Sequence, residues 1–302
     1  MQDTTLRGKT LFITGASRGI GLAIAIRAAR DGANVAIAAK TAAPHPRLPG
    51  TIHTAAEAIE AVGGRALPLV VDVREEDAID KAVAQTAEHF GAIDICVNNA
   101  SALSLRGTLD TQAKSYDLMQ QVNARGTYLT SRSCLPYLLR SQNPHILMIA
   151  PPPRLDPDWF APHLAYSLAK FGMSLCVLGL AKEFAYAGVA VNALWPRTII
   201  GTSAIEFGSG PDGARRMRHA RRPEIMADAA HAIFTQPARA LSGKFLLDDA
   251  VLWEQGVRDF AAYQLDPSVP AQIDMFIPDD APPLPPGVKL IGRSAADLDA
   301  FS

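Results

Sequence analysis

Thr14-Gly-Ala-Ser-Arg-Gly-Ile-Gly21 is the stretch of this sequence that decides the fold. It follows the apolar run Thr10 to Thr14 and precedes a segment with helical apolar spacing, so its glycines lie at a strand-to-helix turn. Glycine lets the backbone turn sharply and approach a ligand closely, and the start of the next helix presents free N–H groups to a phosphate. Ordinary turns also carry this glycine spacing, but in this context it predicts a dinucleotide cradle made of Gly15, Ala16, Ser17, Arg18, Gly19, Ile20 and Gly21.

Short and long apolar segments alternate along the chain. Short runs predict buried strands at Thr10 to Thr14, Asn34 to Ala39, Ala66 to Val71, Ile93 to Val97, Ile146 to Ile149 and Val189 to Leu194. Longer segments predict helices at Gly19 to Arg30, Thr54 to Val62, Glu75 to Phe90, Thr111 to Leu139 and Ala161 to Ala187. This alternation predicts an α/β fold with a parallel sheet covered on both faces. A helix at Glu224 to Phe234 and a seventh strand at Gly243 to Asp248 are expected to complete it.

The C-terminal part of the chain has a different composition. Asp266 to Gly287 is rich in proline and acidic residues, which disfavour a regular helix or a central strand. We therefore expect a single domain at 1–250, followed by an extension at 251–302 that packs on the domain or on a neighbouring subunit.

Composition excludes several classes of protein. The 302 residues are 48% hydrophobic and 20% charged, which is a globular composition, and the net charge of −1 provides no general attraction for nucleic acid or an anionic membrane. The three cysteines, Cys96, Cys134 and Cys176, have neither disulfide-framework nor metal-ligand spacing. No run approaches the roughly 18 apolar residues of a membrane span. We expect a soluble, cytoplasmic protein without a metal.

Polar residues at the ends of the predicted strands favour a particular cofactor. Dinucleotide folds that prefer NAD carry an acidic residue after the second strand. This chain has Lys40 at that position, and Arg18 lies in the glycine loop. Two cations there favour the 2′-phosphate of NADP, although Lys40 at a solvated strand end is the alternative. Asp72 and Val73 end the third strand and Asn99 and Ala100 follow the fourth, positions suited either to the adenine and the nicotinamide ribose or to turns.

Tyr166 and Lys170 lie four residues apart on a predicted helix, so they share one face. A tyrosine has an ordinary pKa near 10, and an adjacent ammonium lowers that pKa by stabilising the phenolate. Lys170 can also hold the nicotinamide ribose. Such a pair is more often a core tyrosine beside a solvated lysine, but after a dinucleotide cradle it indicates an acid/base centre.

These motifs together resemble the short-chain dehydrogenase/reductase family over roughly residues 7 to 250. The glycine motif, Asn-Asn-Ala, Asn123 in Val122-Asn-Ala-Arg-Gly126, the Tyr166–Lys170 pair and Pro196 follow one another in the family's order. Ala39 to Pro46, Val122 to Tyr128 and Asn192 to Pro196 are similar to the hydroxysteroid dehydrogenase-like protein 2 group, and we expect no sterol-carrier domain. The resemblance implies a Rossmann-type doubly wound sheet of about seven strands, NADP, proton transfer by Tyr166 with support from Lys170 and Asn123, and a homodimer or homotetramer.

The chain departs from the family pattern at three positions. Ser101 replaces a glycine, Arg197 replaces the glycine after Pro196, and the active-site serine is absent. Counting back from Tyr166, the serine position falls on Pro153, or with a longer loop on Ala150 or Pro151. Losing such a donor costs roughly 10²- to 10³-fold in rate. Either another donor such as Ser101, His163 or Ser167 substitutes, or catalysis is weak, although each of these three side chains also has an ordinary structural explanation.

The segment from Thr198 to Gly213 has small residues and glycines suited to a mobile lid, and Thr198 or Thr202 is placed to touch the carboxamide. Arg215 to Arg222 holds five arginines, which predict a solvated helix face or a site for a carboxylate or CoA phosphate. Trp159, Phe160, Leu164 and Trp195 predict a hydrophobic substrate.

The sequence thus predicts an NADP(H)-dependent oxidoreductase that interconverts an alcohol and a carbonyl on a fatty, steroid-like or acyl substrate. The alternative is a catalytically weakened NADP(H)-binding regulatory or lipid-binding protein.

Overall fold

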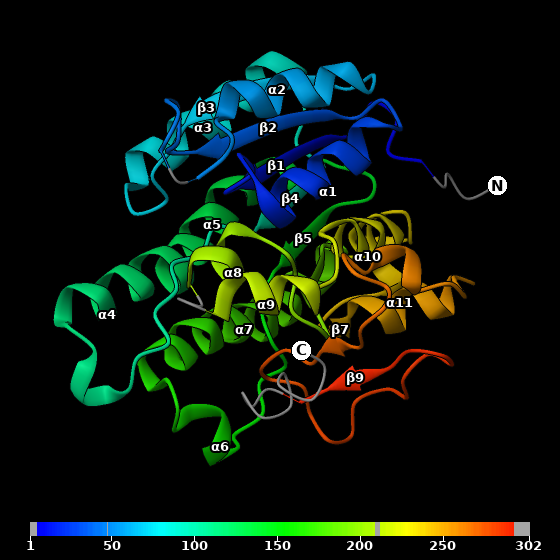
Figure 1. Cartoon of the computed structure of the whole chain (residues 1–302). Helices are drawn as coiled ribbons and strands as arrows, with labels where there is room; N and C mark the ends of the chain where they lie inside the picture. The colour runs from blue at the N-terminus through cyan, green and yellow to red at the C-terminus, as the bar shows by residue number, and fades with distance from the viewer. Residues whose placement is uncertain (1–4, 47, 209–211, 293–302) are drawn as a thin grey trace.

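A seven-stranded parallel sheet forms the centre of the molecule in the computed structural model, which describes residues 5–46, 48–208 and 212–292 (Figure 1). Its strand order is β3-β2-β1-β4-β5-β6-β7, and every neighbouring pair is parallel. The strands are β1 (Thr10–Thr14), β2 (Asn34–Ala39), β3 (Arg65–Val70), β4 (Ile95–Asn98), β5 (His145–Met148), β6 (Ala190–Trp195) and β7 (Phe245–Leu247). The predicted fold class is confirmed.

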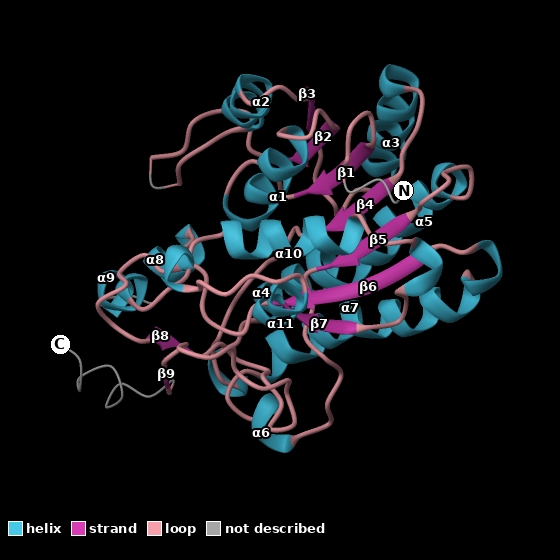
Figure 2. Cartoon of the chain, turned by 90° about the vertical axis from the view of Figure 1, so that its right-hand side faces the viewer, coloured by secondary structure: helices cyan, strands magenta, loops and turns pink. Residues whose placement is uncertain are grey.

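Helices cover both faces of this sheet (Figure 2). One layer contains α1 (Gly19–Ala29), α2 (Ile52–Ala61), α10 (Glu224–Phe234) and α11 (Asp248–Glu254). The other contains α3 (Glu76–Phe90), α4 (Ala113–Met119), α5 (Gly126–Leu138) and α7 (Leu164–Glu183). Because successive side chains of a strand point to opposite faces, each strand feeds both cores: Leu11 and Ile13 pack in the α1 layer, whereas Phe12 packs in the α5 layer.

Two predicted long helices are interrupted. Thr111 to Leu139 contains α4, a π-helical turn at Gln120–Arg125, and α5. Ala161 to Ala187 contains α7, followed by a 3₁₀ turn at Ala185–Ala187, and the short α6 (Pro157–Phe160) precedes it. The apolar spacing also gave no sign of α8 (Ser203–Gly208), α9 (Gly213–Arg218) or α11, which are only six or seven residues long. Helices this short depend on tertiary contacts.

The C-terminal extension packs on the domain at the β7 side of the molecule (Figure 1, orange to red). Within it, β8 (Ala271–Gln272) pairs with β9 (Leu290–Ile291), and no longer strand or α-helix occurs among the described residues 266–292. The arginine run contacts this extension. Arg218 Nε donates to Asp266 (3.0 Å), Arg216 Nε donates to Gln272 (3.1 Å), and Arg222 N donates to the Tyr263 carbonyl. Arg218 and Arg222 are exposed, as the prediction of a solvated face expects, whereas Arg221 is buried.

Among the described residues, α7 is the one helix long and apolar enough to cross a membrane. The sequence predicted this helix within Ala161 to Ala187 but no membrane span, because Lys170 and Lys182 interrupt its apolar residues. In the fold, 61% of its apolar window is buried. It packs on the sheet beside α5, in the same helical layer.

Candidate functional site

The glycine loop after β1 is shaped by close packing against the loop after β4. Gly15 and Gly19 adopt left-handed φ angles of 67° and 58°. A Cβ on Gly15 would lie 2.9 Å from the Cα of Ala100, and one on Gly21 would lie 2.5 Å from the Nδ2 of Asn99. Any side chain larger than glycine at these two positions would therefore displace the β4 loop. The loop leads into α1, whose N-cap residue Arg18 makes no side-chain capping bond.

Thr14 and Asn99 fasten the two loops together. The Thr14 hydroxyl accepts from the N–H groups of Asn99 (3.0 Å) and Ala100 (3.1 Å) and donates to the Val97 carbonyl (3.2 Å). The Asn99 amide donates to the carbonyls of Thr14 (2.9 Å) and Gly15 (3.2 Å). Sequence reasoning assigned Thr14 only to the strand, because its partners lie more than 80 residues away.

Several charged side chains gather at the ends of β2 and β3. Arg18 donates to the carbonyls of Pro49 (2.8 Å) and Gly50 (2.9 Å), and Lys40 is exposed at the end of β2. Asp72 is held by Arg74, with Nη2 to Oδ2 at 2.6 Å. Hydrogen bonding from Arg74, aided by its charge and that of Lys40, lowers the pKa of Asp72. Arg74 is thus a third cation at this edge that the motif search missed.

Asn123 lies in the π-helical turn between α4 and α5 and is fully buried. Its Oδ1 accepts from the N–H of Ala102 (2.7 Å), and its Nδ2 donates to the carbonyl of the same residue (3.0 Å). Such π turns insert one residue into a helix and often mark functional sites. Here the inserted turn lets the Asn123 side chain hold the loop that follows β4.

Tyr166 and Lys170 are buried on the first turns of α7. The Lys170 ammonium donates to the Ile149 carbonyl at 2.8 Å, just beyond the end of β5, and lies 5.4 Å from the ring centroid of Trp195 at the end of β6. Burial lowers the pKa of Lys170 to about 7, although the charge of Asp274 opposes this shift. Lys170 can therefore gain or lose its proton near neutral pH.

The expected electrostatics of Tyr166 are wrong in one respect. Burial raises the pKa of Tyr166 instead of lowering it, and the charge of Asp274 raises it further. The loss of water around the phenolate is the larger cause, and the ammonium of Lys170 is bonded to the Ile149 carbonyl. Asp274 comes from the C-terminal extension, more than 100 residues after Tyr166, and no local motif announces it.

The alternation of β5 narrows the position of the missing serine. Ala150 packs in the α5-side core, whereas Ile149 and Tyr166 pack in the α1-side core. Pro151 and Pro153 share the parity of Ile149, and Pro151 is the nearer of the two to the end of β5 at Met148. Among the candidate substitutes, Ser167 donates to the Trp159 carbonyl (2.7 Å) and contacts His163 Nδ1 (3.0 Å). Ser101 is exposed.

Residues after β6 continue into the site. Pro196 and Thr198 are buried, and among the described residues no hydrogen-bond partner meets the Thr198 hydroxyl. Buried hydroxyls normally have a partner, so this one fits a polar ligand group such as a carboxamide. A Cβ built on Gly19 would lie 3.4 Å from the Thr202 methyl group, so Thr202 borders the glycine loop. The expected lid, Thr198 to Gly213, begins with Thr198 and Ile200, which form isolated β-bridges, and it contains α8. Its residues 209–211 lie outside the described residues.

The arginine in place of a glycine after Pro196 has a structural role. Arg197 Nε lies 2.8 Å from both carboxylate oxygens of Asp249, and its Nη2 donates to the Pro282 carbonyl (2.9 Å). Buried Arg221 pairs with the same carboxylate at 3.4 Å. Burial, reinforced by the charge of Asp249, raises the pKa of Asp248 to about 7. This cluster joins β6 to α11 and to the extension.

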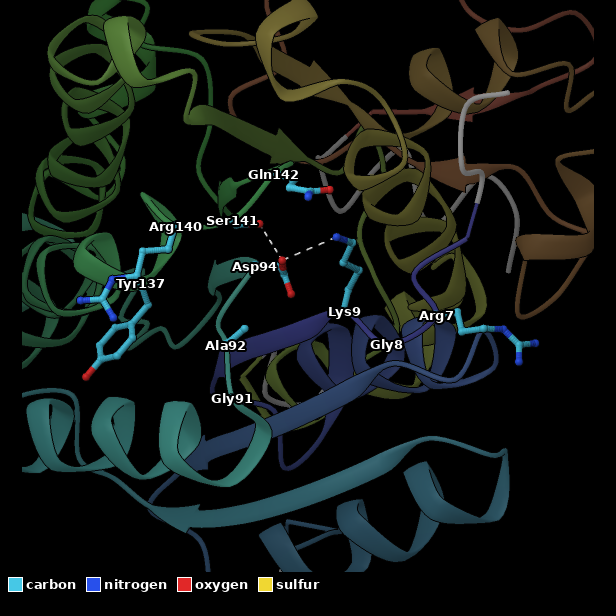
Figure 3. Close-up of a pocket in the computed structure, with 10 residues that line it drawn as sticks. All are labelled: Arg7, Gly8, Lys9, Gly91, Ala92, Asp94, Tyr137, Arg140, Ser141 and Gln142. Carbon is cyan, nitrogen blue, oxygen red and sulfur yellow. Dashed lines mark hydrogen bonds and ion pairs between the residues drawn. The ribbon is translucent and has the colours of Figure 1, made fainter.

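A hollow of about 420 Å³ lies at the opposite edge of the sheet, where β1 and β4 begin (Figure 3). Lys9 and Ser141 point toward Asp94 from its walls, at 3.7 and 2.6 Å, while Arg7 and Arg140 point away. Asp94 also accepts from the N–H of Thr10 (3.0 Å). Its oxygens are thus engaged in holding strand starts, remote from the glycine loop.

Comparisons with known proteins identify the family of this chain. A sequence model of the short chain dehydrogenase family matches residues 9–206. Hydroxysteroid dehydrogenase-like protein 2 of Danio rerio is 56% identical over 92% of this chain and 66% of its own length, and that of Homo sapiens is 55% identical over 90% and 64%. The chain therefore spans just under two thirds of these curated relatives.

Solved structures extend the agreement to three dimensions. A crystal structure of a Xanthomonas campestris protein is 60% identical, with a TM-score of 0.88, over 91% of this chain and 100% of that one. A short chain dehydrogenase from Mycobacterium thermoresistibile is 50% identical, with a TM-score of 0.87, over 94% and 100%. The chain belongs to the short-chain dehydrogenase family of oxidoreductases, which use a nicotinamide cofactor.

Proposed function

We propose that this protein is an NADP(H)-dependent oxidoreductase that interconverts an alcohol and a carbonyl on a hydrophobic substrate. The observation that carries the proposal is the position of Tyr166 and Lys170. Both are on α7 at the carboxyl edge of the sheet, where Lys170 contacts the residues that end β5 and β6. Ligands of open α/β sheets bind at this edge, and the glycine loop opens onto it.

The residues at this edge fit a dinucleotide. The glycine loop and the N-terminus of α1 would hold the pyrophosphate, Asp72 and Val73 would border the adenine, and the orphan hydroxyl of Thr198 would receive the carboxamide. Asn99, Ala100 and Pro196 line the nicotinamide side. Bound nicotinamide supplies or accepts the hydride.

The proton is handled by the chain itself. Tyr166 donates a proton to the carbonyl oxygen during reduction and removes one from the alcohol during oxidation. Its raised pKa keeps the phenol protonated at neutral pH, which suits proton donation. Lys170 would bind the ribose and stabilise the phenolate, and Asn123 supports the relay by fixing the β4 loop through Ala102.

The direct test is oxidation of NADPH in the presence of a panel of aldehydes and ketones from short aliphatic to polycyclic, with NADH measured in parallel. The proposal expects turnover with at least one hydrophobic carbonyl compound and faster turnover with NADPH. Tight NADPH binding without turnover across the panel, and with alcohols plus NADP⁺, would favour the binding-protein alternative.

Lys40→Asp should reverse the cofactor preference. Lys40 is exposed at the end of β2, where a 2′-phosphate would bind beside Arg18. Losing a charge-assisted bond of about 1.5–3 kcal/mol should raise the Kd of NADPH roughly 10- to 100-fold, with little change for NADH. Fluorescence titration with both cofactors measures this. Lys114→Asp on exposed α4 introduces the same charge change elsewhere and serves as the control. Equal weakening by both variants would refute a specific contact.

A weakened enzyme is the alternative favoured by the missing serine, and Pro151→Ser tests it. If the absent donor limits catalysis, a hydroxyl on the Tyr166 side should raise kcat by about 10-fold or more. Ala150→Ser places the same group in the α5-side core and should not raise it. Steady-state kinetics on the best carbonyl compound compare the two variants. An unchanged kcat in Pro151→Ser would show that another donor already serves.

We also propose a homodimer or homotetramer that uses the outer faces of α5 and α7. The apolar side chains exposed there are Tyr128, Leu168, Leu175 and Leu178. Sedimentation velocity distinguishes the two states.

The three free cysteines support a cytoplasmic location.

A further inference from the structure

We propose that Phe276, contributed by the C-terminal extension, forms the wall of the substrate site facing Tyr166 and sets the size of carbonyl compound that the site accepts. The inference rests on the proposed oxidoreductase function and names the residue that determines which substrate sizes that function accepts.

Phe276 is the centre of an aromatic cluster at the catalytic residues. Its ring lies 6.3 Å from that of Tyr166, nearly parallel to it at 24°. The rings of His163 and Trp159 lie at 5.5 Å, Trp195 at 5.8 Å and Phe171 at 6.0 Å. Phe276 is 1% exposed, so this side of Tyr166 is closed by a residue 110 positions further along the chain.

The backbone at Phe276 indicates that its position is strongly imposed. Its φ is 63°, and among the described residues it is the one non-glycine residue in the left-handed region. Bulky residues adopt this conformation only when their surroundings enforce it, and such outliers cluster at functional sites. The enforcing contacts are short: Trp195 Nε1 donates to the Met275 carbonyl (2.8 Å), and the Asp274 N–H donates to the Arg197 carbonyl (2.9 Å).

The same turn is bonded to the strand end that carries Thr198. The Ile199 N–H donates to the Gln272 carbonyl (3.0 Å), and Thr198 is bridged to Ile273. Residues 272–276 therefore lie beside both the proposed carboxamide site and the acid/base pair. The charge of Asp274 reaches both members of that pair, which agrees with this placement. A side chain held rigidly between these groups is positioned to limit the substrate.

The test compares Phe276→Ala, which removes the ring, with Phe276→Gly, which also removes the backbone strain. Leu284→Ala changes an exposed residue of the same extension and is the control. For each protein, kcat/KM with NADPH is measured on short aliphatic and on polycyclic carbonyl compounds. We expect the polycyclic-to-aliphatic ratio to rise at least about 10-fold in both Phe276 variants, mainly through KM. The Kd of NADPH and the Leu284→Ala protein should be unchanged.

An equal change for all substrate sizes, or no change, would overturn the proposal. Thermal melting shows whether Phe276→Ala folds. If it does not, Phe276→Leu is measured instead and should raise the polycyclic-to-aliphatic ratio by a smaller factor. An unchanged ratio in Phe276→Leu would then overturn the proposal. Binding of the same ketones to the NADP⁺ complex is followed by tryptophan fluorescence. This measurement tests the role of Phe276 separately from the proposed oxidoreductase function. If the variants bind bulky ketones more tightly while the wild type shows no turnover, the proposed oxidoreductase function is rejected. The role of Phe276 in limiting substrate size is then supported.

Discussion

Tyr166→Phe should lower kcat by about 10²- to 10⁴-fold, the usual contribution of a positioned acid/base group. The substitution removes one hydroxyl from a ring packed against Phe276 and His163, and it leaves those contacts in place. Single-turnover kinetics at saturating NADPH measure the loss, and fluorescence titration should show an unchanged Kd for NADPH.

Two outcomes would contradict this assignment. A Tyr166→Phe protein with wild-type kcat would show that another group transfers the proton. A loss of NADPH binding together with activity would show that the phenol acts in cofactor binding. Ser167→Ala, one residue further along α7, is the matched control, because the Ser167 hydroxyl donates to the Trp159 carbonyl. It should lower kcat far less than the loss of the phenol.

Asp249→Ala should destabilise the fold by about 3–5 kcal/mol and lower Tm by roughly 10 °C. Asp249 is fully buried and accepts from Arg197 and Arg221, so its removal leaves two buried guanidinium groups without their shared carboxylate. Ionisation of neighbouring Asp248, whose pKa is raised partly by Asp249, will offset part of this cost. Chemical denaturation monitored by circular dichroism measures the difference.

The control for this variant is Asp266→Ala, which removes the carboxylate from an exposed pair with Arg218. Exposed ion pairs contribute little, so this Tm should stay near that of the wild type. Equal and small effects of both substitutions would mean that the buried cluster is dispensable.

The sequence predicted the sheet well because each strand of a doubly covered parallel sheet is a short, continuous apolar run. The predicted bounds of β1 and β2 match the observed strands, and Gly19 begins α1 as expected. The glycine loop was recognisable for a related reason. Its left-handed φ angles and close approach to the β4 loop require glycine at fixed positions, which leaves a local pattern.

What the sequence did not predict depends on contacts between distant segments. Thr14 and Asn99, or Arg197 and Asp249, are separated by more than 50 residues, and nothing local signals their pairing. Asp274 and Phe276 come from a proline-rich segment that resembles an unstructured tail. The raised pKa of Tyr166 followed from burial by that segment, which neighbouring residues in the sequence could not reveal.

The hydrogen bonds between residues 272–276 and the end of β6 have a consequence for engineering. The family pattern ends at residue 206, so the glycine loop and the Tyr166–Lys170 pair lie inside it and Phe276 lies outside. The acid/base pair and the proposed determinant of substrate size are then encoded in separate stretches of the gene. Exchanging the 3′ portion between homologues would diversify the compounds accepted while the hydride-transfer machinery stays intact, provided that the exchanged piece keeps its partners for Trp195 and Arg197.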